Sequence, residues 1–323
     1  MSTAPATSAR LRWRSFDWEL FGLPLVLVLL FIFFSTQAPN FAEASNFSNV
    51  ARQVAVLALI ATAQTAVILT AGIDLSVGSV VALASVLTAI GLREGEPLLG
   101  VALALAAGLA VGLVNGILIG YTAVTPFIVT LGMLSVVSGT ALTITNGDPI
   151  FELPESAFFS LGTGFLGPVP IPVIVALLVF SVVWVLLYRT RFGTHVYAVG
   201  GNEQAARLAG IAVARTKLKV YALSGVCAAL GGVILTARVR SGQPLLGQGL
   251  ELEAVAAVVI GGTSLFGGRG RLMGTIYGVL LVGMVRNGLD LLGVSTFIQR
   301  IVIGVATIAA VLLTVLRERN RAG

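Results

Sequence analysis

Residues 188–219 read YRTRFGTHVYAVGGNEQAARLAGIAVARTKLK and form the longest run of this 323-residue chain that could not lie comfortably in lipid. The chain around this run is apolar, with 57% hydrophobic and only 11% charged residues. Because a soluble domain is about one-quarter charged, this composition predicts an integral membrane protein. The polar run therefore divides the membrane-embedded chain, and the side on which it lies decides the orientation of the spans.

A short helix is predicted at the centre of this run. Asn202 is a good N-cap, Glu203 begins the first turn, and Gly210 suits the left-handed conformation that often ends a helix. A capped helix in a basic loop between two apolar segments is a candidate surface for a cytosolic partner. The alternative is a solvated connection that only carries the charges that set topology.

Ten segments are apolar and about as long as the roughly 20 residues that a bilayer-spanning helix needs. The first follows three arginines and resembles a signal peptide, but no clear cleavage site follows it, so we interpret it as a retained helix. The eighth is short, and a Gly-Ile-Asp turn alone separates the second and third. Eight spans, or nine with a re-entrant segment, therefore remain alternatives. The predicted spans are 20–36, 50–71, 77–92, 98–120, 124–145, 170–188, 218–237, 254–266, 272–291 and 297–316.

The distribution of basic residues predicts the topology. Loops rich in Lys and Arg are retained in the cytosol during insertion. If the N-terminal tail 1–19 is inside, the loop 189–217 and the C-terminal tail 317–323 are inside as well. The cytosolic side then holds 14 of the 20 basic residues. These residues are Arg10, Arg12, Arg14, Arg189, Arg191, Arg207, Arg215, Lys217, Lys219, Arg269, Arg271, Arg317, Arg319 and Arg321.

Small residues on the fourth span predict close helix packing. Five glycines there are spaced by multiples of four, which makes one flat face. Asn115 lies beside that face, where a buried amide could bind a neighbour or line a pathway. A faint inverted repeat, as in many transporters, relates VGLVNG at 111–116 to VGMVRNG at 282–288. The glycines are Gly100, Gly108, Gly112, Gly116 and Gly120.

Polar residues inside the apolar segments are candidates for a solute pathway. Asp74 interrupts two apolar helices, and an acid at membrane depth usually has a task or a partner. We favour capping of the next helix over direct solute contact, although the two roles are compatible. Arg286 and Asp290, four residues apart, are predicted to pair, while Arg286 and Asn287 could also donate to a hydroxylated solute. The candidate pathway residues are Asp74, Ser76, Asn115, Arg286 and Asn287.

Several classes of function are excluded by what the sequence lacks. The glycine-rich run 261–271 has no Gly-Lys-Ser/Thr ending and no preceding strand, so it is not a nucleotide-binding loop. We interpret it as a tight inner turn that touches lipid headgroups or a partner. With Cys227 as the single cysteine and His195 as the single histidine, we predict no disulfide, no metal or cofactor site and no catalytic constellation. The topology explains the net charge of +6 without nucleic acid.

Three stretches in this order and spacing resemble the permeases of bacterial ribose/xylose-type sugar ABC importers: GIDLSVGS at 72–79, GGNEQAARLAGI at 200–211 and GGTSLFGGRG at 261–270. The similarity extends from about residue 47 to 316. The related branched-chain amino acid permeases share the architecture but resemble this chain less at the first stretch. The resemblance implies a type II-like permease domain over 20–316, of about ten helices, in the bacterial inner membrane.

The resemblance also implies partners. They are a separate ABC ATPase that uses the ATP, a periplasmic or lipoprotein sugar-binding protein, and a second permease copy or a paralogue, all at a lipid bilayer. The alternatives are an ABC permease for another small solute, such as a branched-chain amino acid, and an ion-coupled secondary transporter that uses Asp74. Residues implied to couple to the ATPase are Gly200, Gly201, Asn202, Glu203, Ala205, Ala206, Arg207 and Gly210.

Overall fold

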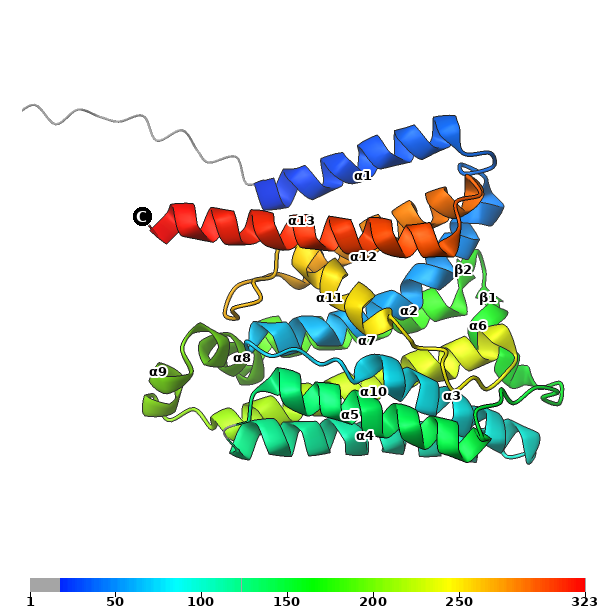
Figure 1. Cartoon of the computed structure of the whole chain (residues 1–323), viewed down its shortest axis with the longest axis horizontal. Helices are drawn as coiled ribbons and strands as arrows, with labels where there is room; N and C mark the ends of the chain where they lie inside the picture. The colour runs from blue at the N-terminus through cyan, green and yellow to red at the C-terminus, as the bar shows by residue number, and fades with distance from the viewer. Residues whose placement is uncertain (1–17, 123, 323) are drawn as a thin grey trace, which may run out of the picture.

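The computed structural model describes residues 18–122 and 124–322, which form a bundle of mostly long helices (Figure 1). The expected helical membrane fold is therefore confirmed in outline, and most of the predicted N-terminal tail 1–19 lies outside the described residues. The helices are α1 (Trp18–Gln37), α2 (Ala44–Leu69), α3 (Val77–Arg93), α4 (Pro97–Tyr121), α5 (Pro126–Thr145), α6 (Ser160–Thr163), α7 (Ile171–Arg189), α8 (Arg191–Gly201), α9 (Glu203–Leu208), α10 (Val213–Val239), α11 (Leu250–Ile260), α12 (Leu272–Leu291) and α13 (Thr296–Ala322). A 3₁₀ turn (Ala157–Phe159) precedes α6, and strands β1 (Phe165–Leu166) and β2 (Val169–Pro170) form a hairpin that pairs Phe165 with Pro170 and Leu166 with Val169.

Each of the ten predicted spans coincides with a helix. Within the described residues, α2, α4, α5, α7, α10 and α12 are long and apolar enough to cross a membrane, and shorter apolar helices cover 22–37, 77–93 and 296–309. The eighth segment differs from its prediction, because α11 ends at Ile260 rather than near residue 266. Gly262 turns the chain there with a φ of +89°. The exact number of spans stays a prediction.

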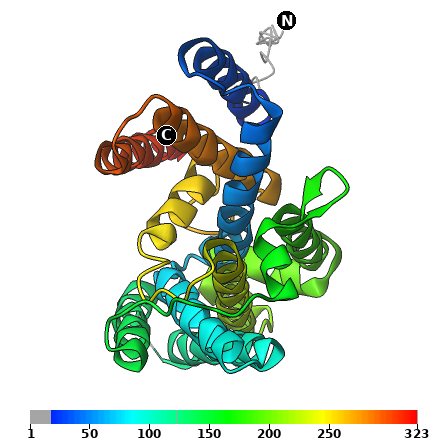
Figure 2. The ribbon, with the colours of Figure 1, turned by 90° about the vertical axis from the view of Figure 1, so that its right-hand side faces the viewer.

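Helices α2 and α10 form the centre of the bundle. In the most apolar window of α2, 83% of the residues are buried, and in that of α10 72%, whereas the figure for α4, α5 and α7 is 22%. Figures 1 and 2 show α3, α4, α5 and α10 on one side and α1, α12 and α13 on the other, with α2 and α11 between them. The wide apolar faces of the peripheral helices suit contact with lipid.

The glycines of the fourth span allow close helix packing, as the sequence predicts: Gly100 packs against Gly91 of α3, and the other four pack against α10. A Cβ on Gly108 would lie 2.4 Å from the carbonyl oxygen of Gly225, and one on Gly112 would lie 2.3 Å from that of Tyr221. Only hydrogen leaves room for backbones this close. The spacing of small residues therefore fixes the contact between the peripheral helix α4 and the centre of the bundle.

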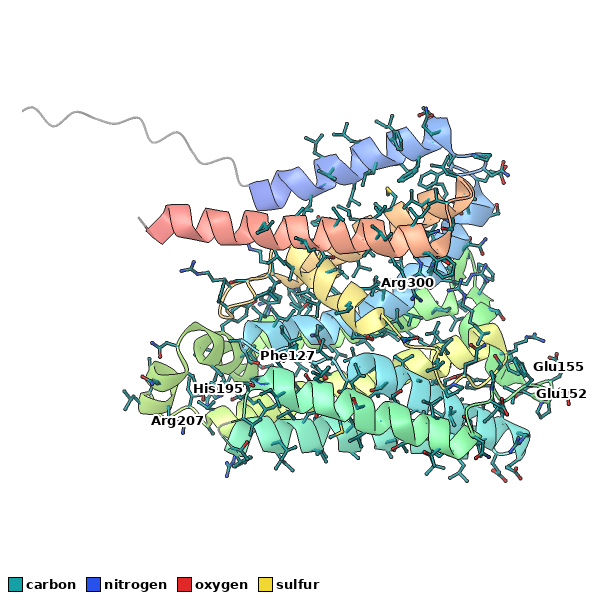
Figure 3. The ribbon with its side chains drawn as sticks, viewed as in Figure 1. Phe127, Glu152, Glu155, His195, Arg207 and Arg300 are labelled. Atoms are coloured by element: carbon teal, nitrogen blue, oxygen red, sulfur yellow. The ribbon has the colours of Figure 1, made fainter. Side chains whose placement is uncertain are left out.

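The two ends of the bundle carry different structures. One end holds α8 and α9 with His195 and Arg207, and the other holds the β hairpin with Glu152 and Glu155 nearby (Figure 3). We call them the α9 end and the hairpin end.

Candidate functional site

Helix α9 begins and ends as the sequence predicts. The Asn202 side chain accepts a hydrogen bond from the Ala205 amide at 2.9 Å, which satisfies a free donor of the first turn. Gly210 has a φ of +82°, and the Ile211 amide donates to the Ala206 carbonyl at 3.0 Å. These caps let a six-residue helix form between α8 and α10.

Side-chain contacts fix α9 to the bundle. The Glu203 carboxylate accepts a hydrogen bond from Lys217 of α10 at 2.7 Å and another from Arg207 at 3.2 Å. The Lys217 hydrogen bond is the main cause that lowers the pKa of Glu203. Ala206 is buried against Val199 and Val213. It is one of the residues implied to couple to the ATPase, but it packs inward and does not face a partner.

The outward face of α9 carries an exposed leucine that the sequence analysis did not select. Leu208 is 90% exposed, and a hollow of about 620 Å³ lined by Tyr121, Arg207 and Ile211 lies beside the helix. Successive helical residues are about 100° apart, so the residue two positions after the buried Ala206 points to the opposite side. If Ala206 is known to face inward, the helical period identifies Leu208 as the outward-facing residue of α9.

At Gly200, the end of α8 packs directly against the backbone at the end of α2. A Cβ on Gly200 would lie 1.7 Å from the Leu69 carbonyl oxygen and 2.6 Å from the Gly268 nitrogen. The Gly268 amide also donates to the Leu69 carbonyl at 3.0 Å. We call these contacts between Leu69, Gly200 and Gly268 the glycine joint.

The glycine joint gives the 261–271 loop a place in the fold. Gly267 and Gly268 pack against the end of α8 and the residues that end α2, whereas Gly261 packs against Gly274 of α12. Tyr197 of α8 donates to the Gly270 carbonyl at 3.0 Å. Phe266, at 67% exposure, is the large apolar side chain that this loop leaves open for a headgroup or a partner. The loop and α8 are thus joined to the end of α2 by direct backbone contacts.

The break between α2 and α3 places Asp74 in a buried polar cluster. One carboxylate oxygen of Asp74 accepts from the Ser76 amide at 3.0 Å and from the Ser76 hydroxyl at 2.6 Å, and the other accepts from Ser224 of α10 at 2.8 Å. The expected capping of α3 by Asp74 is not observed, because Ser76 is the N-cap residue of α3 and no side chain caps this helix; Asp74 instead binds Ser76 itself. Asp74 and Ser76 are each 1% exposed.

Asn115 joins α4 to the same cluster. Its amide nitrogen donates to the Ser76 hydroxyl at 3.0 Å, and its amide oxygen has no hydrogen-bond partner among the described residues. Three of the five candidate pathway residues thus meet at one place, together with Ser224. Irregular backbone at membrane depth is tolerated where protein covers it, and this cluster supplies that cover.

Arg286 and Asn287 lie apart from this cluster, towards the hairpin end. The predicted Arg286–Asp290 pair is wrong: Arg286 instead contacts both carboxylate oxygens of Glu253 on α11, at 3.0 and 3.1 Å. Asp290 accepts from Gln299 of α13 at 2.6 Å. Asn287 exchanges two 2.9 Å hydrogen bonds with Asn46, so its amide is already satisfied. A four-residue spacing makes pairing on one helix feasible, but here both charged groups turn to neighbouring helices.

The long apolar helices, the helix break covered by protein and the capped helix at one end fit an integral membrane protein, and comparison with known proteins gives its class. Residues 46–311 match the family described as "Branched-chain amino acid transport system / permease component". The chain belongs to this family, so it is a multi-pass transport component of the inner membrane rather than an enzyme.

Several proteins that this chain resembles are permeases of sugar transport systems. The chain is 48% identical to the ribose import permease protein RbsC of Bacillus subtilis, over 90% of each chain. It is 44% identical to RbsC of Escherichia coli, over 97% of this chain and 98% of the relative. The L-arabinose transport system permease protein AraH of Escherichia coli is 36% identical over 94% of this chain and 93% of its own. No solved structure matches.

Proposed function

We propose that this chain is the permease subunit of an ATP-driven importer of ribose or a similar monosaccharide. The names of the relatives support a sugar substrate, and ribose is the solute of the two relatives that cover this chain at 48% and 44% identity. The sequence has no nucleotide-binding loop of its own. A separate ATPase must therefore supply the energy, and a soluble or lipid-anchored binding protein delivers the sugar at the hairpin end.

The main observation behind this proposal is that α9 is held rigidly to the bundle while one apolar side chain on it is exposed. Its caps and the Glu203–Lys217 ion pair fix a short helix at the end of the bundle, while Leu208 is left 90% exposed. An apolar side chain on a fixed, charged helix is a suitable anchor for a groove in a partner protein. In this proposal α9 sits in the ATPase, and the exposed side chains of Arg207 and Leu208 make the contact.

A route from the ATPase to the centre of the bundle follows from the glycine joint. Movement of α9 displaces α8, and Gly200 passes that displacement to Leu69 at the end of α2. Asp74 and Ser76 follow Leu69 in the chain and hold α10 and α4 by hydrogen bonds. ATP binding then shifts the population between two arrangements of the central helices, which alternates access to the solute path.

Reconstitution tests the proposal. The permease, its ATPase and its binding protein are placed in liposomes, and uptake of radiolabelled D-ribose is measured with and without ATP. We expect uptake that requires ATP and is insensitive to ionophores. Uptake driven by an ion gradient without the ATPase would instead establish a secondary transporter.

The α9 contact is tested by Leu208→Asp. Loss of a buried leucine anchor costs about 1.5–3 kcal/mol, so we expect ATPase co-purification and ribose uptake to fall at least about tenfold. Leu166→Asp in β1 is the matched control for ATPase co-purification, because Leu166 is also exposed, at 69%, but lies at the hairpin end, away from α9. Unchanged ATPase binding and uptake in Leu208→Asp would refute the assignment of α9.

A further inference from the structure

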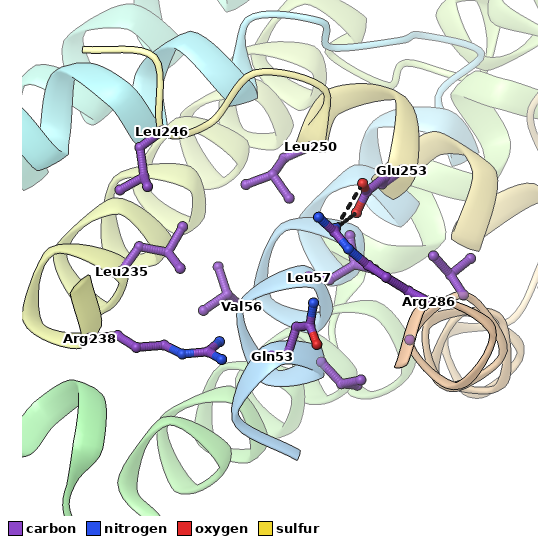
Figure 4. Close-up of a pocket in the computed structure, with 12 residues that line it drawn as sticks. Gln53, Val56, Leu57, Leu235, Arg238, Leu246, Leu250, Glu253 and Arg286 are labelled. Carbon is purple, nitrogen blue, oxygen red and sulfur yellow. Dashed lines mark hydrogen bonds and ion pairs between the residues drawn. The ribbon is translucent and has the colours of Figure 1, made fainter. Parts of the chain in front are cut away.

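A cavity of about 170 Å³ lies between α2, α10, α11 and α12 (Figure 4). It is in the half of the bundle near the hairpin end, because Arg238 in its wall is next to Gly162 of α6. Pockets for drug-sized ligands usually measure about 300–1,000 Å³. This cavity therefore suits a much smaller solute.

Two polar side chains in the wall have unused hydrogen-bonding groups. Gln53 of α2 and Arg238 of α10 point into the cavity (Figure 4), and neither has a hydrogen-bond or ion-pair partner among the described residues. The Gln53 amide offers both a donor and an acceptor, and the Arg238 guanidinium offers five N–H donors. Unpartnered polar groups in a confined space favour a ligand that satisfies them.

The opposite wall holds an ion pair with spare acceptor capacity. Glu253 is 18% exposed and binds Arg286 through a single guanidinium nitrogen, at 3.0 and 3.1 Å. A carboxylate has about four lone-pair sites, so Glu253 can also accept from hydroxyl groups. Apolar side chains complete the wall, namely Val54, Val56, Leu57, Leu235, Leu246, Leu250 and Val282.

The mixture of groups selects the chemistry of the ligand. Hydroxyl groups donate and accept, so a polyol can satisfy the Gln53 amide, the Arg238 guanidinium and the Glu253 carboxylate together. The C–H faces of a sugar ring match the apolar part of the wall. Glu253 is already paired with Arg286, so the charge that the wall leaves uncompensated is that of Arg238, and inorganic phosphate is the competing ligand that the experiment must include.

We infer that this cavity is a solute site for a neutral monosaccharide, with Gln53 and Arg238 contacting sugar hydroxyls and Glu253 accepting from them. The inference rests on the proposed sugar import and adds to it the residues that meet the sugar. Of the pathway residues predicted from sequence, it includes Arg286, whose role is to orient Glu253. A site on a transport path must bind weakly enough to release, so we expect low affinity.

Cysteine labelling tests the site without the ATPase or the binding protein. Cys227 is buried and is the only cysteine of the chain, so Cys227→Ala provides a background without thiols. Leu246→Cys is introduced in the cavity wall, at a position that supplies no proposed hydrogen bond to the sugar. The full-length permease is placed in lipid nanodiscs, and its modification by methyl methanethiosulfonate is timed with increasing D-ribose. A ligand at about ten times its Kd lowers the unoccupied fraction about tenfold, so we expect labelling to slow about tenfold at saturation.

Controls separate the outcomes. Ser160→Cys, exposed on α6, should label at a rate that ribose does not change. Leu235→Cys, also in the cavity wall, is a second reporter if Leu246→Cys does not fold. The inference is overturned if ribose protects neither reporter at the highest concentration that leaves Ser160→Cys unaffected. It is also overturned if inorganic phosphate at matched ionic strength protects and ribose does not. Lack of protection alongside normal ATP-dependent uptake would reject the cavity alone and leave the proposed function intact.

Discussion

Asp74 shows how a single buried acid can organise a helix break. Its carboxylate accepts three hydrogen bonds, two from Ser76 and one from Ser224, and each of these side chains is 1% exposed. An unpaired buried charge is expensive, whereas one that accepts several hydrogen bonds is tolerated. The acid therefore ties the start of α3 to α10 across 150 residues of sequence.

We expect Ser224→Ala to destabilise the permease. The substitution removes the donor to one carboxylate oxygen of Asp74 and leaves that oxygen without a partner. Leaving such a group unsatisfied costs about 1–3 kcal/mol. Unfolding in a titration with sodium dodecyl sulfate, followed by tryptophan fluorescence, measures the change. Ser181→Ala is the matched control, since Ser181 is exposed on α7 and bonds its own helix at 2.8 Å. Equal stability of the two variants would contradict the role of Ser224.

The Glu203–Lys217 pair makes the fixing of α9 depend on pH. The pKa of Glu203 is lowered from its usual 4.5, chiefly by the Lys217 hydrogen bond. Because the pKa of Glu203 is lower in the folded protein, the stabilisation that the ion pair gives is complete above pH 4.5. It is lost as the pH falls through the pKa that Glu203 has in the folded protein. We expect amide hydrogen exchange in α9, corrected for its intrinsic rate, to rise below that pH. The effect is modest because the carboxylate is 41% exposed.

A Glu203→Gln variant provides the comparison. It has no carboxylate to protonate, so exchange in its α9 should lack the step below pH 4.5. The same step in both proteins would show that another group causes it.

Residue patterns that are local in sequence could be predicted, and pairings between distant helices could not. The caps of α9 and the glycine face of α4 depend on neighbours within one or two turns, so spacing alone identified them. The partner of Arg286 depends on where α11 crosses α12. Because Glu253 is 33 residues away, nothing in the sequence distinguished it from Asp290, which is nearer along the chain. The Asn46–Asn287 pair was missed for the same reason.

At the scale of elements, the glycine joint connects the proposed partner-binding helices to the membrane helices. Gly200 of α8, Leu69 of α2 and Gly268 of the 261–271 loop meet without an intervening side chain. Backbone contacts of this kind are stiff, because no flexible side chain can absorb a displacement. The glycines of this loop look like a phosphate-binding pattern in sequence, but in the fold they allow three segments to approach closely.

We expect Gly200→Ala to impair coupling and Gly201→Ala to be tolerated. A methyl group on Gly200 would lie 1.7 Å from the Leu69 carbonyl oxygen, so the backbone of α8 or α2 must move. A methyl group on Gly201 meets nothing within 4 Å. The measurement is the ratio of ribose uptake to ATP hydrolysis in the reconstituted complex. Gly200→Ala should lower this ratio, and identical ratios in the two variants would show that the joint transmits nothing.

For the whole molecule, the arrangement of helices separates a buried centre from a lipid-facing periphery. In their most apolar stretches, 83% of the residues of α2 are buried but only 22% of those of α4, α5 and α7, although all four helices are strongly apolar. Hydropathy alone could not make this distinction, because a helix that is apolar all round fits either environment. The cavity forms where α2, α10, α11 and α12 meet, so it lies between the two helix groups seen in Figure 2.

The orientation of the whole bundle is the final prediction. The basic residues of the loop 189–217 lie at the α9 end, and Glu152 and Glu155 lie at the hairpin end (Figure 3). Retention of positive charge in the cytosol then places the α9 end inside, where an ATPase can reach it, and the cavity on the outer side. In the Cys227→Ala background, we expect a membrane-impermeant maleimide to label Ser160→Cys in intact cells. Ala209→Cys, exposed next to α9, should be labelled only after the cells are opened. Labelling of Ala209→Cys in intact cells would reverse the topology, and with it both the ATPase contact and the route of sugar entry.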